Sequence, residues 1–235
     1  LADAPEGVSG MNDPNRRAYN DLLSNEPAWP GLEAIARASG RVVVLPREAP
    51  AAEACLERLQ VTTRSALGAL AYETGGLLID AGWLRLFGAG SATLTRPLGA
   101  WNDALGIDVA DLLVFGDDVV GGLFAINGGA LGPARGSVFY FAPDELAWID
   151  LERGHGAFVE WAMTGDLAMF YKHLRWPGWE QECAALAADQ ALSLYPPPWS
   201  QEGKDVARVS RRPVSALELW QAQLEMARQL GEASK

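Results

Sequence analysis

Apolar runs of four to eight residues recur through the first two thirds of the chain, separated by breaks that contain glycine. Runs rich in Val, Leu, Ile and Phe are typical of β-strands, and breaks such as Ala81-Gly82 are typical of hairpins. Strands that mostly follow strands indicate an antiparallel sheet. We expect strands at 41–45, 67–72, 77–80, 83–87, 111–115, 119–126, 137–141 and 147–151.

On both sides of this block, apolar residues recur with the spacing of an α-helix. Pro30 and Pro50 stand where first helical residues are favoured, and apolar residues follow each at helical spacing. After residue 156 apolar positions again recur every three and four residues, and Ser215-Ala-Leu-Glu218 is a capping box for an amphipathic terminal helix. The prolines at 196–198 predict an extended segment, and 200–212 is interpreted as a polar loop.

Together these patterns predict an α+β fold in one domain. We expect a loose N-terminal arm at 1–27 and a single domain at 28–235. Its central, largely antiparallel sheet is expected at about 41–151, after N-terminal helices, and its C-terminal helices at about 156–231. A chain of 235 residues that is 49% hydrophobic has enough apolar side chains for a substantial core.

The net charge of −11 is unevenly distributed along the chain. Residues 99–190 carry four basic and fourteen acidic groups, a net charge of −10, whereas 1–98 and 191–235 are close to neutral. Such a surface repels nucleic acid and anionic lipid and accelerates encounter with a basic protein. The other interpretation is that dispersed carboxylates only keep the protein in solution. We therefore expect no nucleic-acid partner and no membrane partner.

The sequence gives little sign of secretion or membrane insertion. Its longest uncharged run, 119–134, is interrupted by glycines, an asparagine and a proline and does not fit a membrane span. No signal peptide is evident, although Ala2-Asp3-Ala4 resembles the end of a cleaved one. Cys55 and Cys183 belong to no paired motif, and free thiols fit as well as a lone disulfide. We expect a cytoplasmic protein.

Motifs of several common catalytic classes are missing from the sequence. It has no Gly-x-Ser-x-Gly elbow, no Walker A lysine, no His-Glu-x-x-His and no cysteine pair for a metal. The glycine-rich segments 88–90 and 128–129 lack the strand-then-helix context of a phosphate loop, so we interpret them as turns. We predict no catalytic residue, no metal site and no cofactor.

Four carboxylates are the candidates for a partner-binding surface. Asp117 and Asp118 precede one apolar strand, and Asp144 and Glu145 follow the next, all within the acidic segment. Adjacent residues of a strand point to opposite faces, so Asp117 and Asp118 would not act as a pair within a ladder. We interpret both as solvated loop residues, and we predict that all four acids bind a partner.

Other side chains leave an alternative open. His155, in a predicted loop, could act as an exposed acid or base, while His173 fits a structural role near a helix end. Trp176 and Trp179 could form a flat platform for a sugar, although indoles that pin irregular segments to the core explain them as well. The alternative function is a small hydrolase using carboxylates and His155, or a carbohydrate-binding domain.

Several longer motifs of the chain are typical of one bacterial family. They are 61–80, 117–129, Phe139-Tyr-Phe-Ala-Pro-Asp144, Gly165-Asp-Leu-Ala168, Leu174-Arg-Trp-Pro-Gly-Trp179 and Tyr195-Pro-Pro197. Through these motifs the chain is similar over about 29–220 to the family of unknown function DUF2625. That resemblance implies no established activity and no active site.

A shorter part of the chain has a second recognisable order of strand, strand and helix. Its parts are the glycine-rich run Gly121-Gly-Leu-Phe-Ala-Ile126, the strand Val138-Phe-Tyr-Phe141 and the run Ala157-Phe-Val-Glu-Trp161. In this order the chain is similar, over 117–165, to the SUKH immunity-protein superfamily. Neither the hairpins before residue 111 nor the long C-terminal part belongs to that pattern. The resemblance implies binding and neutralisation of a toxin protein, often a basic nuclease, without catalysis.

We therefore predict a non-enzymatic protein-binding module of immunity or antitoxin type. Its acidic surface is expected to bind a basic partner protein, such as a toxin, and the prediction depends on the acidic middle segment and the missing catalytic motifs. A structural or oligomerisation module is a third interpretation and would present a large apolar surface patch. The sequence does not define the oligomeric state.

Overall fold

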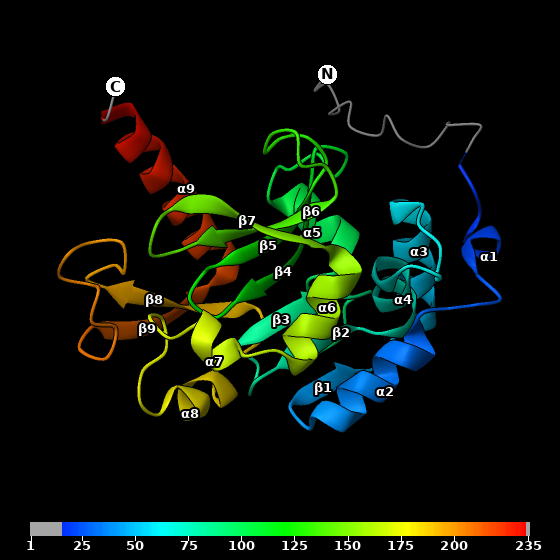
Figure 1. Cartoon of the computed structure of the whole chain (residues 1–235), viewed down its shortest axis with the longest axis horizontal. Coiled ribbons are helices and arrows are strands. Elements are labelled where there is room, and N and C mark those ends of the chain that lie inside the picture. The colour runs from blue at the N-terminus through cyan, green and yellow to red at the C-terminus, as the bar shows by residue number, and fades with distance from the viewer. Residues whose placement is uncertain (1–15, 234–235) are drawn as a thin grey trace, which may run out of the picture.

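The computed structural model describes residues 16–233, and a seven-stranded sheet forms its centre (Figure 1). The strands lie in chain order, and each pairs antiparallel with the next. The predicted α+β fold with a central antiparallel sheet is therefore confirmed. The strands are β1 Val42–Leu45, β2 Gly76–Ile79, β3 Leu84–Phe87, β4 Leu112–Asp118, β5 Leu123–Asn127, β6 Ser137–Ala142 and β7 Ala147–Gly154.

The register of pairing decides which side chains share a face of the sheet. Val43, Leu78, Arg85 and Asp117 are successive partners across β1 to β4, so their side chains form one row. Residues one position further along each strand point to the opposite face, because the side-chain period of a strand is two. The row that contains Asp117 therefore faces one layer of the molecule, and Asp118 faces the other.

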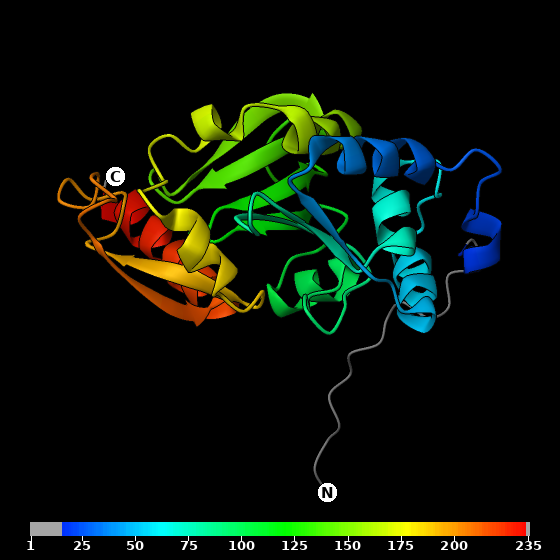
Figure 2. The same ribbon diagram turned by 90° about the horizontal axis from the view of Figure 1, so that it is seen from below.

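Helices cover the face toward which Asp118 points (Figure 2). They come from distant parts of the chain, and their apolar side chains are buried against the strands. Phe158 is one of them, and its ring centroid lies 4.8 Å from that of Phe124 in β5. The helices of this layer are α2 Trp29–Ser39, α6 His155–Thr164 and α7 Leu167–Phe170.

The opposite face carries α5 Leu98–Ala104 and the C-terminal part of the chain (Figure 2). Phe141 of the sheet contacts Trp220 of the last helix on this side, with ring centroids 5.0 Å apart. A second sheet of two antiparallel strands belongs to the same layer. The C-terminal elements are α8 Trp179–Ala184, β8 Gln190–Tyr195, β9 Ser210–Ser215 and α9 Ala216–Ala233.

The other N-terminal helices pack on one another and on α2, α5 and α6. They are α1 Tyr19–Leu22, α3 Ala49–Leu59 and α4 Ala66–Glu73. Leu22 is fully buried, and its carbonyl accepts a hydrogen bond of 3.0 Å from the Thr63 amide. Part of the predicted loose arm is therefore packed on the domain, and its residues 1–15 lie outside the described part of the chain.

The strand expected at 67–72 is wrong, because this segment forms α4. Ser65 caps the helix, with its hydroxyl oxygen accepting a 3.0 Å hydrogen bond from the Gly68 amide. The run that follows consists mainly of Ala and Leu, which favour helix and lack the β-branching typical of strands. Because α4 is largely buried, its sequence shows no polar face that would reveal a helical period.

The polar loop expected at 200–212 is shorter than predicted. Its end belongs to β9, which pairs with β8. Arg211, which falls within this predicted loop, donates from Nε to Glu182 Oε2 at 3.0 Å, and its guanidinium lies 4.5 Å from the centre of the Trp176 ring. These partners lie about 30 residues earlier in the chain, so no local pattern predicts them.

Within 16–233, no helix combines the length and the apolar character that crossing a membrane requires.

Candidate functional site

Asp117 and Asp118 both lie inside the molecule, at the end of β4. Their exposed fractions are 3% and 0%, so the interpretation of both as solvated loop residues is wrong. The expectation that they point to opposite faces is confirmed, because Asp117 pairs with Arg85 and Asp118 with Leu84 in one ladder. Neither carboxylate lies at the surface, where a partner protein would meet it.

Two arginines hold the Asp117 carboxylate. Arg85 Nε donates to Asp117 Oδ1 at 2.7 Å, and Arg96 forms a second ion pair with the same carboxylate. Arg85 Nη1 also donates to the carbonyls of Ala188 and Gln190. Burial lowers the pKa of Arg96, and the Asp117 carboxylate opposes that shift. A buried charge needs both a counter-charge and hydrogen bonds, and this cluster supplies them between the sheet and the C-terminal layer.

Asp118 accepts three hydrogen bonds on the other face. Its Oδ1 accepts from the amides of Val120 at 3.0 Å and Gly122 at 2.8 Å, and its Oδ2 accepts from the Tyr140 hydroxyl at 2.7 Å. Burial raises the pKa of Asp118 to about 6, although these donors act in the opposite direction. Such a carboxyl is typical of a catalytic site only when a substrate reaches it, and the Asp118 side chain is 0% exposed.

Asp144 and Glu145 lie at the surface, in the turn between β6 and β7. Both line a cavity of about 280 Å³ together with His173, Pro198 and Lys204. Neither acid forms an ion pair with another described residue, and Lys204 supplies the cationic group of the lining. The structure therefore brings two of the four predicted acids together in one cavity and separates them from the other two.

His155 begins α6, and its imidazole is turned into the core. Both ring nitrogens are inaccessible to solvent and have no hydrogen-bond partner among the described residues. The ring meets Phe115 edge-on, with centroids 4.6 Å apart, and burial lowers the pKa of His155 to about 4. His155 is therefore not an exposed acid or base, because no carboxylate orients it and no solvent reaches its nitrogens.

The two tryptophans considered as a sugar platform pack around Trp83. Trp176 is 3% exposed, and its Nε1 donates to Glu182 Oε1 at 2.8 Å. Trp179 is half-buried, and the guanidinium carbon of Arg175 lies 4.0 Å from the centre of its ring. Both rings lie within 6 Å of Trp83 by centroid. The interpretation as indoles that pin an irregular segment to the core fits this geometry, and a flat exposed platform does not.

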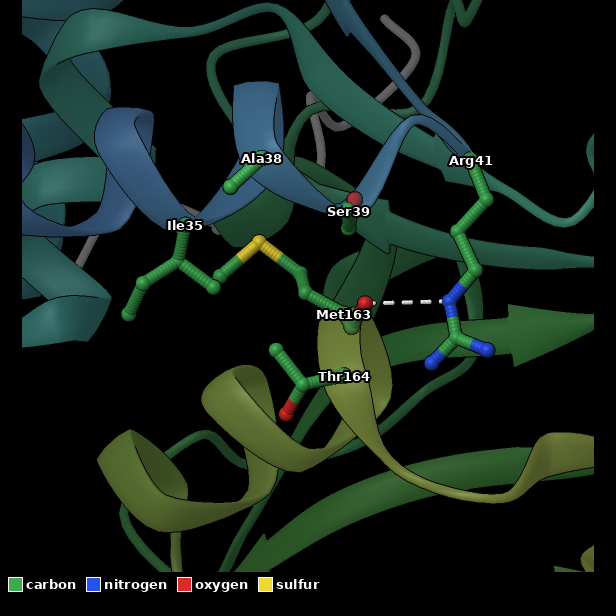
Figure 3. A pocket seen from close by; sticks show the side chains of 6 residues that line it. All are labelled: Ile35, Ala38, Ser39, Arg41, Met163 and Thr164. Atoms are coloured by element: carbon green, nitrogen blue, oxygen red, sulfur yellow. Dashed lines mark hydrogen bonds between the residues drawn. The ribbon is translucent and has the colours of Figure 1, made fainter.

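A cavity of about 380 Å³ lies between the ends of α2 and α6 (Figure 3). Ile35 and Met163 give it an apolar wall, and Arg41 lies at its edge. Arg41 Nε donates to the Met163 carbonyl at 3.0 Å, and its Nη2 donates to the Gly165 carbonyl at 2.8 Å. These bonds satisfy carbonyls at the end of α6, so Arg41 acts as a helix cap.

The possible metal ligands and the cysteines add no further site within the described part of the chain. No group of three or more His, Cys, Asp or Glu side chains between residues 16 and 233 is placed to hold a metal. Cys55 and Cys183 are free and buried, and burial raises their pKa values to about 11 and about 12. Such thiols remain protonated at neutral pH and are poor nucleophiles.

The sequence analysis missed two features that the structure makes prominent. Arg85 stands alone among Leu and Phe in the fully buried β3, and an isolated arginine in an apolar strand was the available signal. The second feature is an apolar groove beside α9, whose rim includes Tyr195. The tyrosine next to three prolines was noted as an extended segment, but nothing local indicated that α9 would lie against it.

Known relatives cover most of the chain. A family model described as protein of unknown function DUF2625 matches residues 19–219. The uncharacterised protein YbfG of Escherichia coli (strain K12) is 42% identical over 212 residues, which are 89% of this chain and 97% of that protein. An uncharacterised protein of Haemophilus influenzae (strain ATCC 51907 / DSM 11121 / KW20 / Rd) is 36% identical over 182 residues, which are 75% and 79% of the two chains. No solved structure matches significantly. The chain belongs to the DUF2625 family, as its motifs predicted.

Proposed function

We propose that this chain is a non-enzymatic protein-binding module of immunity or antitoxin type that binds a basic partner protein. The observation that carries the proposal is the turn at Asp144 and Glu145, where two adjacent carboxylates line one cavity and no ion pair with a described residue neutralises either. Two such carboxylates favour a lysine or arginine side chain over a neutral or acidic one. The proposed site is smaller than the four-acid surface expected from the sequence, because Asp117 and Asp118 are buried.

The elements that follow this turn carry further carboxylates. β7, an edge strand, carries Asp150 and Glu152, and α6 carries Glu160. Unpaired carboxylates keep their field at the surface, and that field steers a basic protein toward the turn at a rate that falls with added salt. Among the fourteen carboxylates of 99–190, ion pairs with described residues engage Asp103, Asp117 and Glu182.

Two further considerations favour binding over catalysis. The resemblance of 117–165 to the SUKH immunity proteins implies a toxin-binding role, and Asp144 and Glu145 belong to that segment. His155 is not placed to act as the base of a hydrolase, because its nitrogens are buried without a carboxylate partner. Trp176 is not placed to stack on a sugar, since it is 3% exposed.

Affinity capture from the native cells at low salt tests the proposal. The wild-type chain should capture a basic protein, and the complex reconstituted from purified components should weaken as salt increases. The double variant Asp144→Lys with Glu145→Lys should bind that protein at least about tenfold more weakly, because two attractive charges become repulsive.

The matched control is the double variant Glu48→Lys with Glu180→Lys. It makes the same change in net charge at two exposed positions, before α3 and in the first turn of α8. We expect it to slow association slightly and to leave dissociation unchanged. Equal weakening in both double variants would show that total charge, and not the turn, governs binding. Capture of an acidic protein, or of none, would contradict the proposed function itself.

A further inference from the structure

An apolar groove lies between α9 and β8, in the C-terminal layer. Figure 2 shows α9 beside the β8–β9 hairpin, and the groove between them has a volume of about 440 Å³. That volume is within the roughly 300–1,000 Å³ usual for small-molecule sites. One wall consists of residues spaced three and four apart on α9, and the other of 192–195 and 197–199. The α9 residues are Leu219, Ala222, Gln223 and Met226.

The chemistry of the lining selects for an uncharged molecule. None of the lining side chains is ionisable near neutral pH, and the walls are aliphatic, aromatic and proline-rich. Tyr195 is 73% exposed at the rim, and Trp199 is half-buried beside it. These surfaces accept a flat or aliphatic apolar body, whereas an ionised ligand would lose its hydration without gaining a counter-charge.

Gln223 gives the groove a polar group with an unmet hydrogen bond. The residue is 8% exposed, and its Nε2 donates to the Val120 carbonyl at 3.2 Å. Its Oε1 has no partner among the described residues. The bond to the Val120 carbonyl identifies the nitrogen end of the amide, because an amide oxygen in the place of Nε2 would repel that carbonyl. The unpartnered atom is therefore an acceptor, and a buried acceptor without a donor is destabilising.

Gly121 provides the space that the Gln223 amide occupies. Gly121 has a φ of +93°, and a Cβ at this position would lie 2.6 Å from Gln223 Nε2 and 2.8 Å from Oε1. The bond from Nε2 to Val120 is at the long end of the N–H···O range, so it opposes rotation of the side chain only weakly. Gln223 itself lines the groove, so rotation of its amide can bring Oε1 to a molecule bound there.

We infer that this groove binds a small uncharged molecule with an apolar body and one N–H or O–H donor. The apolar body lies against Tyr195, Trp199 and Met226, and the donor bonds to Gln223 Oε1. The groove adjoins the cavity at Asp144 and Glu145 at one shared lining residue, Pro198, and the other lining residues differ. The contacts proposed here involve neither acid, so this inference does not depend on the proposed protein partner.

N-Phenyl-1-naphthylamine is a suitable probe, because it is uncharged and aromatic, carries one N–H donor and fluoresces more strongly in apolar surroundings. We expect the full chain to bind it saturably at one site. The matched competitor is 1-benzylnaphthalene, in which a methylene group replaces the N–H. It should bind about tenfold more weakly, because it covers the Gln223 oxygen without supplying a donor.

Variants separate the role of the groove from that of the amide. Ala222→Trp fills the groove from an exposed position on α9 and should weaken probe binding at least about tenfold. Gln221→Trp, also exposed but outside the groove, should leave the affinity unchanged. Gln223→Leu removes the acceptor and should bring probe and competitor within about twofold of each other.

Two results would overturn the inference. Probe binding that survives Ala222→Trp would show that the probe binds elsewhere. Equal affinities of the wild-type chain for probe and competitor would remove the assigned role of Gln223. A melting curve checks the fold of each variant, and if Gln223→Leu does not fold, the competitor and the two Trp variants still decide the question.

Discussion

Arg85 and Asp117 are cross-strand partners on β3 and β4, and Arg85 Nε donates to Asp117 Oδ1 at 2.7 Å with both side chains buried. Arg85 Nη1 also donates to the carbonyls of Ala188 and Gln190, at 3.2 Å and 2.6 Å. Arg85 thus ties the segment that leads into β8 to the middle of the sheet. The same ties position one wall of the apolar groove, because β8 forms that wall.

Asp117→Asn should be strongly destabilising. The change removes the carboxylate that forms ion pairs with both buried guanidinium groups, those of Arg85 and Arg96, and removing one side of a buried ion pair costs about 3–5 kcal/mol. Arg96→Met should cost less, because Arg85 and Asp117 then remain paired one to one. Urea denaturation of the three proteins measures the free energies of unfolding. A larger loss in Arg96→Met than in Asp117→Asn would contradict this account of the cluster.

Gly122→Ala tests the close packing around Asp118. A Cβ at Gly122 would overlap Asp118 Oδ2 and the ring of Tyr140, so we expect a loss of about 2 kcal/mol in the free energy of unfolding. Gly31→Ala is the control, because Gly31 is exposed in α2 with no atom within 4 Å of the added methyl. It should stabilise by about 0.5–1 kcal/mol. Melting curves of both variants give the comparison.

The strands were predictable because burial leaves a local pattern in them. The period of two also predicted that Asp117 and Asp118 point to opposite faces. Their burial was not predictable, since the arginines that neutralise Asp117 lie 32 and 21 residues earlier in the chain. Two adjacent acids without a local partner are usually solvated, and only the folded sheet supplies the exception.

The errors in secondary structure have a similar cause. The segment now seen as α4 is apolar on every side, so its sequence does not distinguish a buried helix from a buried strand. The strand β9 contains a proline and two arginines and becomes a strand only by pairing with β8. The candidate sites differ in the same way. Asp144 and Glu145 are adjacent in the sequence, which therefore offered them as candidates. The groove joins Val120 to Gln223 across 103 residues, and no local pattern indicates it.

The thiols of Cys55 and Cys183 should not react with thiol reagents while the chain is folded. Burial raises the pKa of Cys55 to about 11 and that of Cys183 to about 12, and both side chains are shielded from solvent. At about pH 8 we expect no reaction with DTNB until the chain unfolds, and then both thiols should react. Rapid reaction of one thiol in the folded chain would contradict its burial, and the variants Cys55→Ala and Cys183→Ala would identify it.

Asp118→Asn should change how stability depends on pH. The pKa of Asp118 is about 6 in the folded chain against 3.8 for an unperturbed carboxyl, so folding favours the protonated form. The stabilisation of the folded chain by this preference is complete below about pH 4 and is lost as the pH rises through about 6. Asn stays neutral throughout. The free energy of unfolding of the variant relative to wild type should therefore rise by roughly 3 kcal/mol from about pH 4 to about pH 7.5. Urea titrations across that range measure the change.

His155→Phe should show the opposite dependence over the same range. Burial lowers the pKa of His155 to about 4 from 6.5, so folding favours the neutral ring. The stabilisation of the folded chain by this preference is present above about pH 6.5 and is lost as the pH falls toward about 4. Over that range the imidazole takes up a proton in the unfolded chain but stays neutral in the folded chain. Phe keeps the edge-on contact with Phe115 and does not titrate.

Relative to wild type, the stability of His155→Phe should therefore rise by roughly 3 kcal/mol as the pH falls from about 7.5 to about 4. Asp118→Asn should gain in the other direction, so the two variants serve as controls for each other. In the wild-type chain the two contributions oppose each other between about pH 4 and pH 6.5 and partly cancel. Single variants expose them separately. If either variant showed no drift relative to wild type, the residue that it replaces would have to be in contact with solvent in the folded chain.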